Sequence, residues 1–140
     1  MPIARRTRVR EVVLQILYQD DINPTADAGE TDRFVRERLK NDPISLEFAY
    51  GLLGGVRRNR AELDSLLSNA AENWTLARMA VTDRNILRMG AFEILYTSTP
   101  QRVSINEAVE LAKRYGARQS PQFVNGLLDR LLREVKKESS

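Results

Sequence analysis

Four arginines near the start of the chain are the residues most able to bind an anion. They are Arg5, Arg6, Arg8 and Arg10, and no acid accompanies them in the first ten residues. The 140-residue chain has a net charge of +3, so the remainder sums to about −1. A guanidinium group is a planar fork that grips phosphate oxygens and stacks on nucleobases. The cluster indicates an anionic partner, with nucleic acid first, although a solvated and frayed terminus would have the same composition.

A second candidate binding group lies in the last quarter of the chain. Here Arg118, Gln119 and Ser120 lead into an expected helix that carries Phe123 and Asn125. A helix N-terminus offers N–H groups to phosphate. Amide side chains can read base edges, and an aromatic ring can stack on an unpaired base. The alternative is that Phe123 is a core residue and Ser120 only a helix cap, and spacing alone favours that alternative.

Catalytic groups are scarce in this sequence. The chain has no cysteine and no histidine, which excludes disulfides, thiolate zinc sites, cysteine nucleophiles and a Ser-His-Asp triad. Neither a GxxxxGK[ST] nor a GxGxxG phosphate loop is present. Glu107 and Glu110 could bind a hard cation in principle, but a cap and a solvated side chain explain them better. A carboxylate- or lysine-based enzyme is still compatible with this sequence, but the remaining signals suit a binding protein with no metal and no cofactor.

Apolar residues recur at helical spacing along the whole chain, and no stretch alternates as a strand does. The first helix is expected from about Ala4 to Asp20, which places its arginines in the first two turns. Cations there oppose the helix dipole, so a partner explains the cluster better than helix stability does. The apolar face of this helix consists of Val9, Val12, Val13, Ile16 and Leu17.

Caps and chain breaks predict where the later helices begin. The expected starts are Thr31-Asp32, Asp42-Pro43, Asn59 with Glu62, Thr82-Asp83, Ser104 with Glu107, and Ser120-Pro121. The third helix is expected to bury Ile44, Phe48, Leu52 and Val56. Gly116 is placed to follow the helix that begins at Ser104. The chain is therefore predicted to be an all-α domain of about seven helices.

We expect the whole chain, 1–140, to form one compact domain of two helical subdomains. A joint near Trp74 would divide an N-terminal half, about 1–73, from a C-terminal half, about 74–140. No apolar run approaches the ~20 residues of a membrane span, and no apolar segment follows the N-terminal arginines as in a signal peptide. We therefore expect a cytoplasmic protein without a membrane partner.

Four segments carry a resemblance to a known family. They are the arginine-rich stretch 5–18, and the segments 83–93 (DRNILRMGAFE), 103–116 (VSINEAVELAKRYG) and 123–129 (FVNGLLD). These segments closely resemble the NusB family of transcription antitermination factors. The resemblance covers essentially the whole chain, and the strings INEAVELAK and FVNG are long and specific.

The resemblance implies an all-helical, non-catalytic RNA-binding protein. Family members bind the boxA element of single-stranded leader RNA together with the ribosomal protein NusE. They join an RNA polymerase antitermination complex on ribosomal RNA operons. By position, the residues expected to contact RNA are Arg5, Arg6, Arg8, Arg10, Arg118, Gln119, Ser120, Phe123 and Asn125. Those expected to face NusE are Tyr18, Arg84 and Arg88.

Several alternatives stay open at this stage. Asn125 suits RNA recognition and the pairing of buried backbone groups equally well, whereas Asn106 is expected to be a buried amide. Some family members self-associate, so a homodimer remains an alternative to a monomer.

Two other functions also remain as hypotheses. The first is a protein-binding adaptor whose arginines pair with an acidic surface. The other hypothesis is a module of a ribosomal RNA methyltransferase, but the chain lacks a Gly-rich cofactor loop and a catalytic cysteine.

Overall fold

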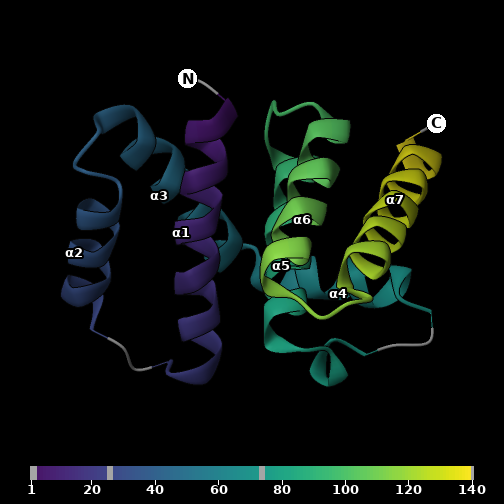
Figure 1. Cartoon of the computed structure of the whole chain (residues 1–140). Coiled ribbons are helices and arrows are strands. Elements are labelled where there is room, and N and C mark those ends of the chain that lie inside the picture. The colour runs from purple at the N-terminus through teal and green to yellow at the C-terminus, as the bar shows by residue number, and fades with distance from the viewer. Residues whose placement is uncertain (1–2, 25–26, 73–74, 140) are drawn as a thin grey trace. The chain divides into compact units, whose positions relative to one another are not determined.

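This computed structural model describes residues 3–24, 27–72 and 75–139, and every regular element within them is a helix (Figure 1). The elements in order are α1 (Ile3–Ile22), α2 (Ala28–Arg38), α3 (Pro43–Arg58), α4 (Arg60–Ala70), the 3₁₀ turn η1 (Leu76–Arg78), α5 (Val81–Tyr96), α6 (Gln101–Tyr115) and α7 (Ser120–Ser139). The predicted all-α class is confirmed. Within these ranges no helix is both long and apolar enough to cross a bilayer.

The chain divides into two units, Met1–Arg57 (unit 1) and Arg58–Ser140 (unit 2). This division falls earlier than the predicted joint between residues 73 and 74, and Trp74 itself lies outside the described residues. The helix α4 belongs to unit 2 because it packs against α5 and α7. Such long-range packing leaves no local signal in the sequence.

Unit 1 contains α1, α2 and α3. The predicted apolar face of α1 is confirmed, since Val9, Val12, Val13, Ile16 and Leu17 are all at most 4% exposed. The predicted stripe on α3 is wrong at Ile44, which is 55% exposed, although Leu52 and Val56 are buried. A stripe with a spacing of four residues rotates by about 40° per step on a helix of 3.6 residues per turn. Ile44 and Val56 therefore face directions about 120° apart.

The helix starts in unit 1 were predicted with mixed success. At α3 the prediction is confirmed, because Pro43 opens the helix and the Asp42 carboxylate accepts a hydrogen bond from the Ser45 N–H at 3.0 Å. The start of α2 at Thr31-Asp32 is wrong. Asp27 caps this helix by accepting a hydrogen bond from the Gly29 N–H at 2.9 Å, so Asp32 lies inside the helix.

Unit 2 is built around α5, whose residues Asn85–Ile94 are all buried. This helix packs against α4, α6 and α7. Gly90 allows the close approach, because a Cβ there would lie 2.8 Å from Leu128 Cδ1 and 3.4 Å from Ala108 Cβ. A larger residue at position 90 would have to displace α7 side chains.

The start of α6 differs from expectation, whereas its end agrees with it. The capping box predicted at Ser104 and Glu107 lies one turn inside the helix, which begins at Gln101 after Pro100. Ser104 is buried, and its hydroxyl donates back to the Pro100 carbonyl. Gly116 does follow the helix, but its φ of −94° is accessible to any residue. Space explains this glycine, since a Cβ would lie 2.6 Å from Ser120 Cβ.

Candidate nucleic-acid interface

The four arginines of α1 divide into two pairs with different surroundings. Arg6 and Arg10, one helical turn apart, both lie over the ring of Phe48 in α3, with their guanidinium carbons 5.1 and 5.3 Å from its centroid. Arg10 is only 2% exposed. Arg5 and Arg8 have exposed side chains. The predicted cluster therefore offers two exposed cations and two that are held against an aromatic ring.

The two exposed arginines differ in their neighbours. Arg5 Nη1 lies 3.7 Å from Asp42 Oδ2. That carboxylate already accepts from the Ser45 hydroxyl at 2.7 Å, and the Ser45 hydrogen bonds together with Arg5 lower the pKa of Asp42 below its ordinary 3.8. Arg8 has no ion-pair partner among the described residues. Arg8 is thus the most available cation on α1 for a phosphate group.

In unit 2, Ser120 fixes the loop that leads into α7. Its hydroxyl accepts a hydrogen bond from the Ala117 N–H at 2.9 Å and donates one to Asp83 Oδ2 at 3.0 Å. The residue is 2% exposed. This geometry favours a positioning role for Ser120, in place of the direct RNA contact predicted from the sequence. The neighbouring Arg118 and Gln119 are exposed.

A cleft of about 420 Å³ lies beside this loop, and we call it the Gln119 cleft. It is lined by residues of η1, α5, the loop and α7, among them Arg78, Asp83, Gln119, Ser120 and Phe123. The Oδ1 atom of Asp83 is buried there without a hydrogen-bond partner among the described residues. The cleft therefore combines an exposed amide, an arginine and an aromatic wall, which are groups that suit a nucleobase.

Phe123 is partly exposed and also lines a second cleft, of about 270 Å³, which we call the Gly126 cleft. The Phe123 ring is therefore neither a buried core residue nor fully exposed, and it contributes to the walls of both clefts. Asn125 points elsewhere: it is exposed and lines neither cleft. Asn106, expected as a buried amide, is also exposed.

The residues expected to face a protein partner lie in three different settings. Tyr18 is 38% exposed and lies one turn before Ile22, which is 53% exposed, at the end of α1. Arg84 is partly buried and donates to the Leu76 carbonyl at 3.2 Å. Of the three, Tyr18 has the exposed side chain that a partner could contact directly. Arg84 ties α5 to η1.

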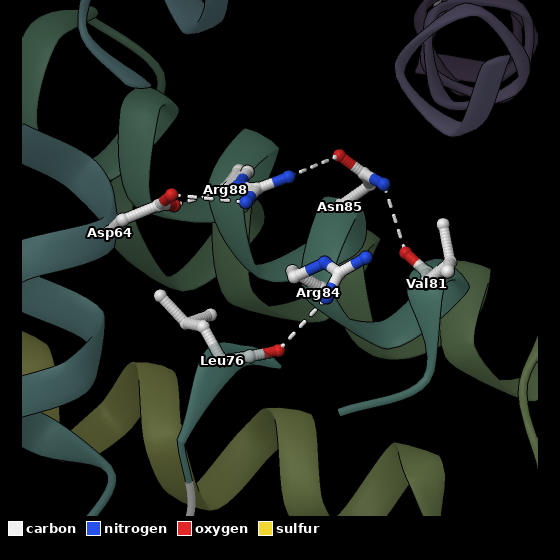
Figure 2. A network of polar contacts seen from close by, with 6 residues as sticks. All are labelled: Asp64, Leu76, Val81, Arg84, Asn85 and Arg88. Carbon is white, nitrogen blue, oxygen red and sulfur yellow. Dashed lines mark hydrogen bonds and ion pairs between the residues drawn. The ribbon is translucent and has the colours of Figure 1, made fainter. Parts of the chain in front are cut away.

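Arg88 is committed to a polar network inside unit 2 (Figure 2). Its Nε and Nη2 donate to the two carboxylate oxygens of Asp64 at 2.7 and 3.0 Å, and its Nη1 donates to Asn85 Oδ1 at 3.1 Å. The Asn85 amide in turn donates to the Val81 carbonyl at 2.9 Å. Since the Arg88 side chain is 5% exposed, it links α4 to α5 instead of facing a partner.

Sequence reasoning missed several residues of these sites. Phe48 was expected only as a core residue, although the guanidinium groups of two arginines lie over its ring. Gly126 and Arg130 were not singled out, and their signal was helical spacing: both lie on the face of α7 that begins at Phe123. Arg78 and Asp83 enter the Gln119 cleft through packing of η1 and α5, which no local pattern predicts.

Within the described residues, no group of three His, Cys, Asp or Glu side chains is arranged to hold a metal ion. The fold and the two candidate surfaces define an all-helical binding protein, with an arginine-bearing first helix and an aromatic residue set between clefts. The sequence pattern of the NusB family matches residues 7–133. The chain belongs to the NusB family.

Relatives and solved structures agree with this assignment. The transcription antitermination protein NusB of Myxococcus xanthus is 48% identical over 132 residues, which are 91% of this chain and 94% of the relative. The corresponding protein of Anaeromyxobacter dehalogenans is 44% identical, over 91% of this chain and 90% of the relative. The structure of T. maritima NusB superposes with a TM-score of 0.83 at 36% identity, covering 96% of this chain and 92% of that one.

A further solved structure contains ligands. It holds the antitermination factors NusB and NusE in complex with double-stranded RNA, and matches with a TM-score of 0.81 at 27% identity over 95% of this chain and 99% of the other. Family membership confirms the resemblance and fold expected from the sequence. It also supports the expectation of a non-catalytic factor.

Proposed function

We propose that this chain is a transcription antitermination factor that binds boxA-type single-stranded leader RNA together with NusE. In this role it joins the RNA polymerase antitermination complex on ribosomal RNA operons, without catalysis and in the cytoplasm. The observation that carries the proposal is the setting of Phe123, a partly exposed ring next to the exposed Gln119. Relatives named as antitermination proteins, and one in a complex with NusE and RNA, support it.

Each group has a physical task in this proposal. Arg8, with Arg5 beside it, neutralises phosphates and makes the affinity depend on salt. Phe123 stacks on an unpaired base, and Gln119 reads its edge. The ring of Phe48 in α3 holds the guanidinium groups of Arg6 and Arg10 in place. Arg118 and Asn125 are exposed and remain proposed contacts at the rim.

The test is a titration of labelled RNA read by fluorescence anisotropy. The probes are a single-stranded boxA-type RNA, a scrambled strand and an RNA duplex, because the relative's complex holds double-stranded RNA. Each is measured at several salt concentrations, with and without NusE. We expect tighter binding to the boxA strand than to the scrambled strand, strengthened by NusE. Equal, weak and salt-sensitive binding to all three probes would contradict the proposal.

A protein-binding adaptor is the second candidate. The exposed pair Tyr18 and Ile22 favours it, since two large apolar side chains one turn apart are a small docking surface. In our proposal this surface binds NusE and complements RNA binding. The adaptor function alone predicts that an acidic polypeptide, but not RNA, competes for the chain. Sedimentation at rising concentration would show in the same samples whether the chain forms a homodimer.

A further inference from the structure

We propose that the Gly126 cleft receives a second unpaired nucleobase, so that the Phe123 ring separates two neighbouring bases of the bound strand. The inference rests on the proposed RNA-binding function. It assigns to the RNA a cleft whose lining residues Gln122, Gly126 and Arg130 have no other assigned role. All of them lie on α7, and none of them lines the Gln119 cleft.

The size and lining of this cleft suit a small flat group. Its volume of about 270 Å³ is below the roughly 300–1,000 Å³ of sites for drug-sized ligands. Leu127 and Phe123 give it apolar walls, while Gln122 and Glu72 stand at its edge with groups that accept hydrogen bonds from a base. A single base offers the matching combination of flat apolar faces and polar edges.

Gly126 leaves this space open. A Cβ at position 126 would have no heavy atom within 4 Å, and no glycine of the described chain has a positive φ. Neither packing nor backbone conformation therefore requires glycine here, in contrast to Gly90 and Gly116, where a Cβ would meet atoms within 3 Å. Glycine is unfavourable inside a helix. The absence of a side chain at position 126 keeps this part of the cleft open.

Arg130 supplies charge at the same place. Its Nη1 donates to the Ala70 carbonyl at 2.7 Å, which holds the guanidinium beside the cleft. The group has five N–H donors, and this is its single hydrogen bond among the described residues. The remaining donors suit a phosphate of the strand that enters the cleft. Because Phe123 lines both clefts, a strand that stacks one base in the Gln119 cleft brings its next base to this one.

The experiment fills the cleft without harming the fold. Gly126→Leu places a side chain in open space and replaces a poor helix former, so we expect an unchanged or higher melting temperature. We expect about tenfold weaker binding to the single-stranded boxA-type RNA, from loss of one stacked base. Gly51→Leu is the matched control, because Gly51 is also an exposed helical glycine with no atom within 4 Å of a Cβ. It should raise stability and leave the affinity unchanged.

Abasic substitutions along the RNA identify the lost contact. With the unmodified protein, abasic sites at two neighbouring positions should each weaken binding, and Gly126→Leu should abolish the response at one of them. An unchanged affinity of Gly126→Leu overturns the inference while the proposed function stands. Weaker binding of Gly126→Leu to NusE with an unchanged RNA affinity also overturns the inference, because the cleft would then bind the protein partner. Failure of the unmodified protein to bind RNA defeats the proposed function itself.

Discussion

Arg88 and Ser120 of unit 2 and Arg6 and Arg8 of unit 1 have contrasting surroundings. In unit 2, Arg88 is held by both oxygens of Asp64, and the hydroxyl of Ser120 is used once as donor and once as acceptor. In unit 1, Arg6 lies on the uncharged ring of Phe48, and Arg8 faces solvent. Arg88 and Ser120 are thus matched by other protein groups, whereas Arg6 and Arg8 keep charge that a phosphate can neutralise.

This difference separates stability from binding. A matched polar group contributes to the free energy of unfolding, and its loss leaves a partner buried without a hydrogen bond. An exposed cation contributes little to stability but adds to the salt dependence of RNA binding. Changes to the groups that match Arg88 and Ser120 should therefore appear first in unfolding experiments, and changes to the exposed arginines of α1 first in the slope of affinity against salt.

The largest effect is expected at the buried ion pair. Asp64→Ala leaves the Arg88 guanidinium buried without its carboxylate, which should cost about 3 kcal/mol of unfolding free energy. The value is at the low end for buried pairs because the Asp64 side chain is 29% exposed. Urea denaturation measures it. Asp129→Ala removes a carboxylate that faces arginines at 3.9 and 4.0 Å on the surface and should cost little. Equal losses for both variants would show that burial of Arg88 does not make its ion pair more important for stability than an exposed pair.

A second, smaller effect is expected at Ser120. Ser120→Ala removes both hydrogen bonds of the hydroxyl, which should lower stability by about 1–2 kcal/mol. The loop that carries Gln119 then loosens, so RNA affinity should fall while the salt slope stays unchanged. Ser68→Ala, at an exposed serine of α4, is the control. A loss of RNA affinity with stability unchanged would show that Ser120 contacts the RNA directly, as the sequence suggested.

The helices were predictable because their apolar spacing is local. The face of α1 and the start of α7 at Ser120 follow from patterns that span a few turns. Caps were predicted less well, since a pattern such as Ser104 with Glu107 recurs inside helices. Which occurrence lies at a helix end depends on the preceding residues, here Pro100. The starts of α2 and α6 were misplaced for this reason.

The sites were predictable only as sequence neighbourhoods. The sequence located the arginines of α1 and the segment from Arg118 to Phe123, but not which side chains face solvent. Phe48 reaches Arg6 and Arg10 from another helix, and Asp64 reaches Arg88 across 24 residues. Burial of Arg88 and Ser120 follows from such long-range contacts, for which a single sequence provides no spacing rule.

A third prediction tests the aromatic support in unit 1. Phe48→Leu keeps an apolar side chain but removes the ring beneath Arg6 and Arg10, so stability should fall by about 1 kcal/mol. Phe34→Leu is the matched control, because one arginine, Arg38, lies over that ring at 4.8 Å. Thermal unfolding of both variants should show the greater loss at Phe48. RNA affinity should also fall for Phe48→Leu alone if the ring orients Arg6 toward the strand.

The smallest change in stability and the clearest change in binding are expected at Arg8. Arg8→Ala removes an exposed cation without a described partner, so the melting temperature should stay the same. The slope of log affinity against log salt should become shallower by about 0.7, the value for one phosphate contact on a single strand. Arg33→Ala removes the same charge from the surface of α2 and is the matched control. If both variants change the slope equally, α1 contributes only general positive charge, and Arg8 is no phosphate contact of its own.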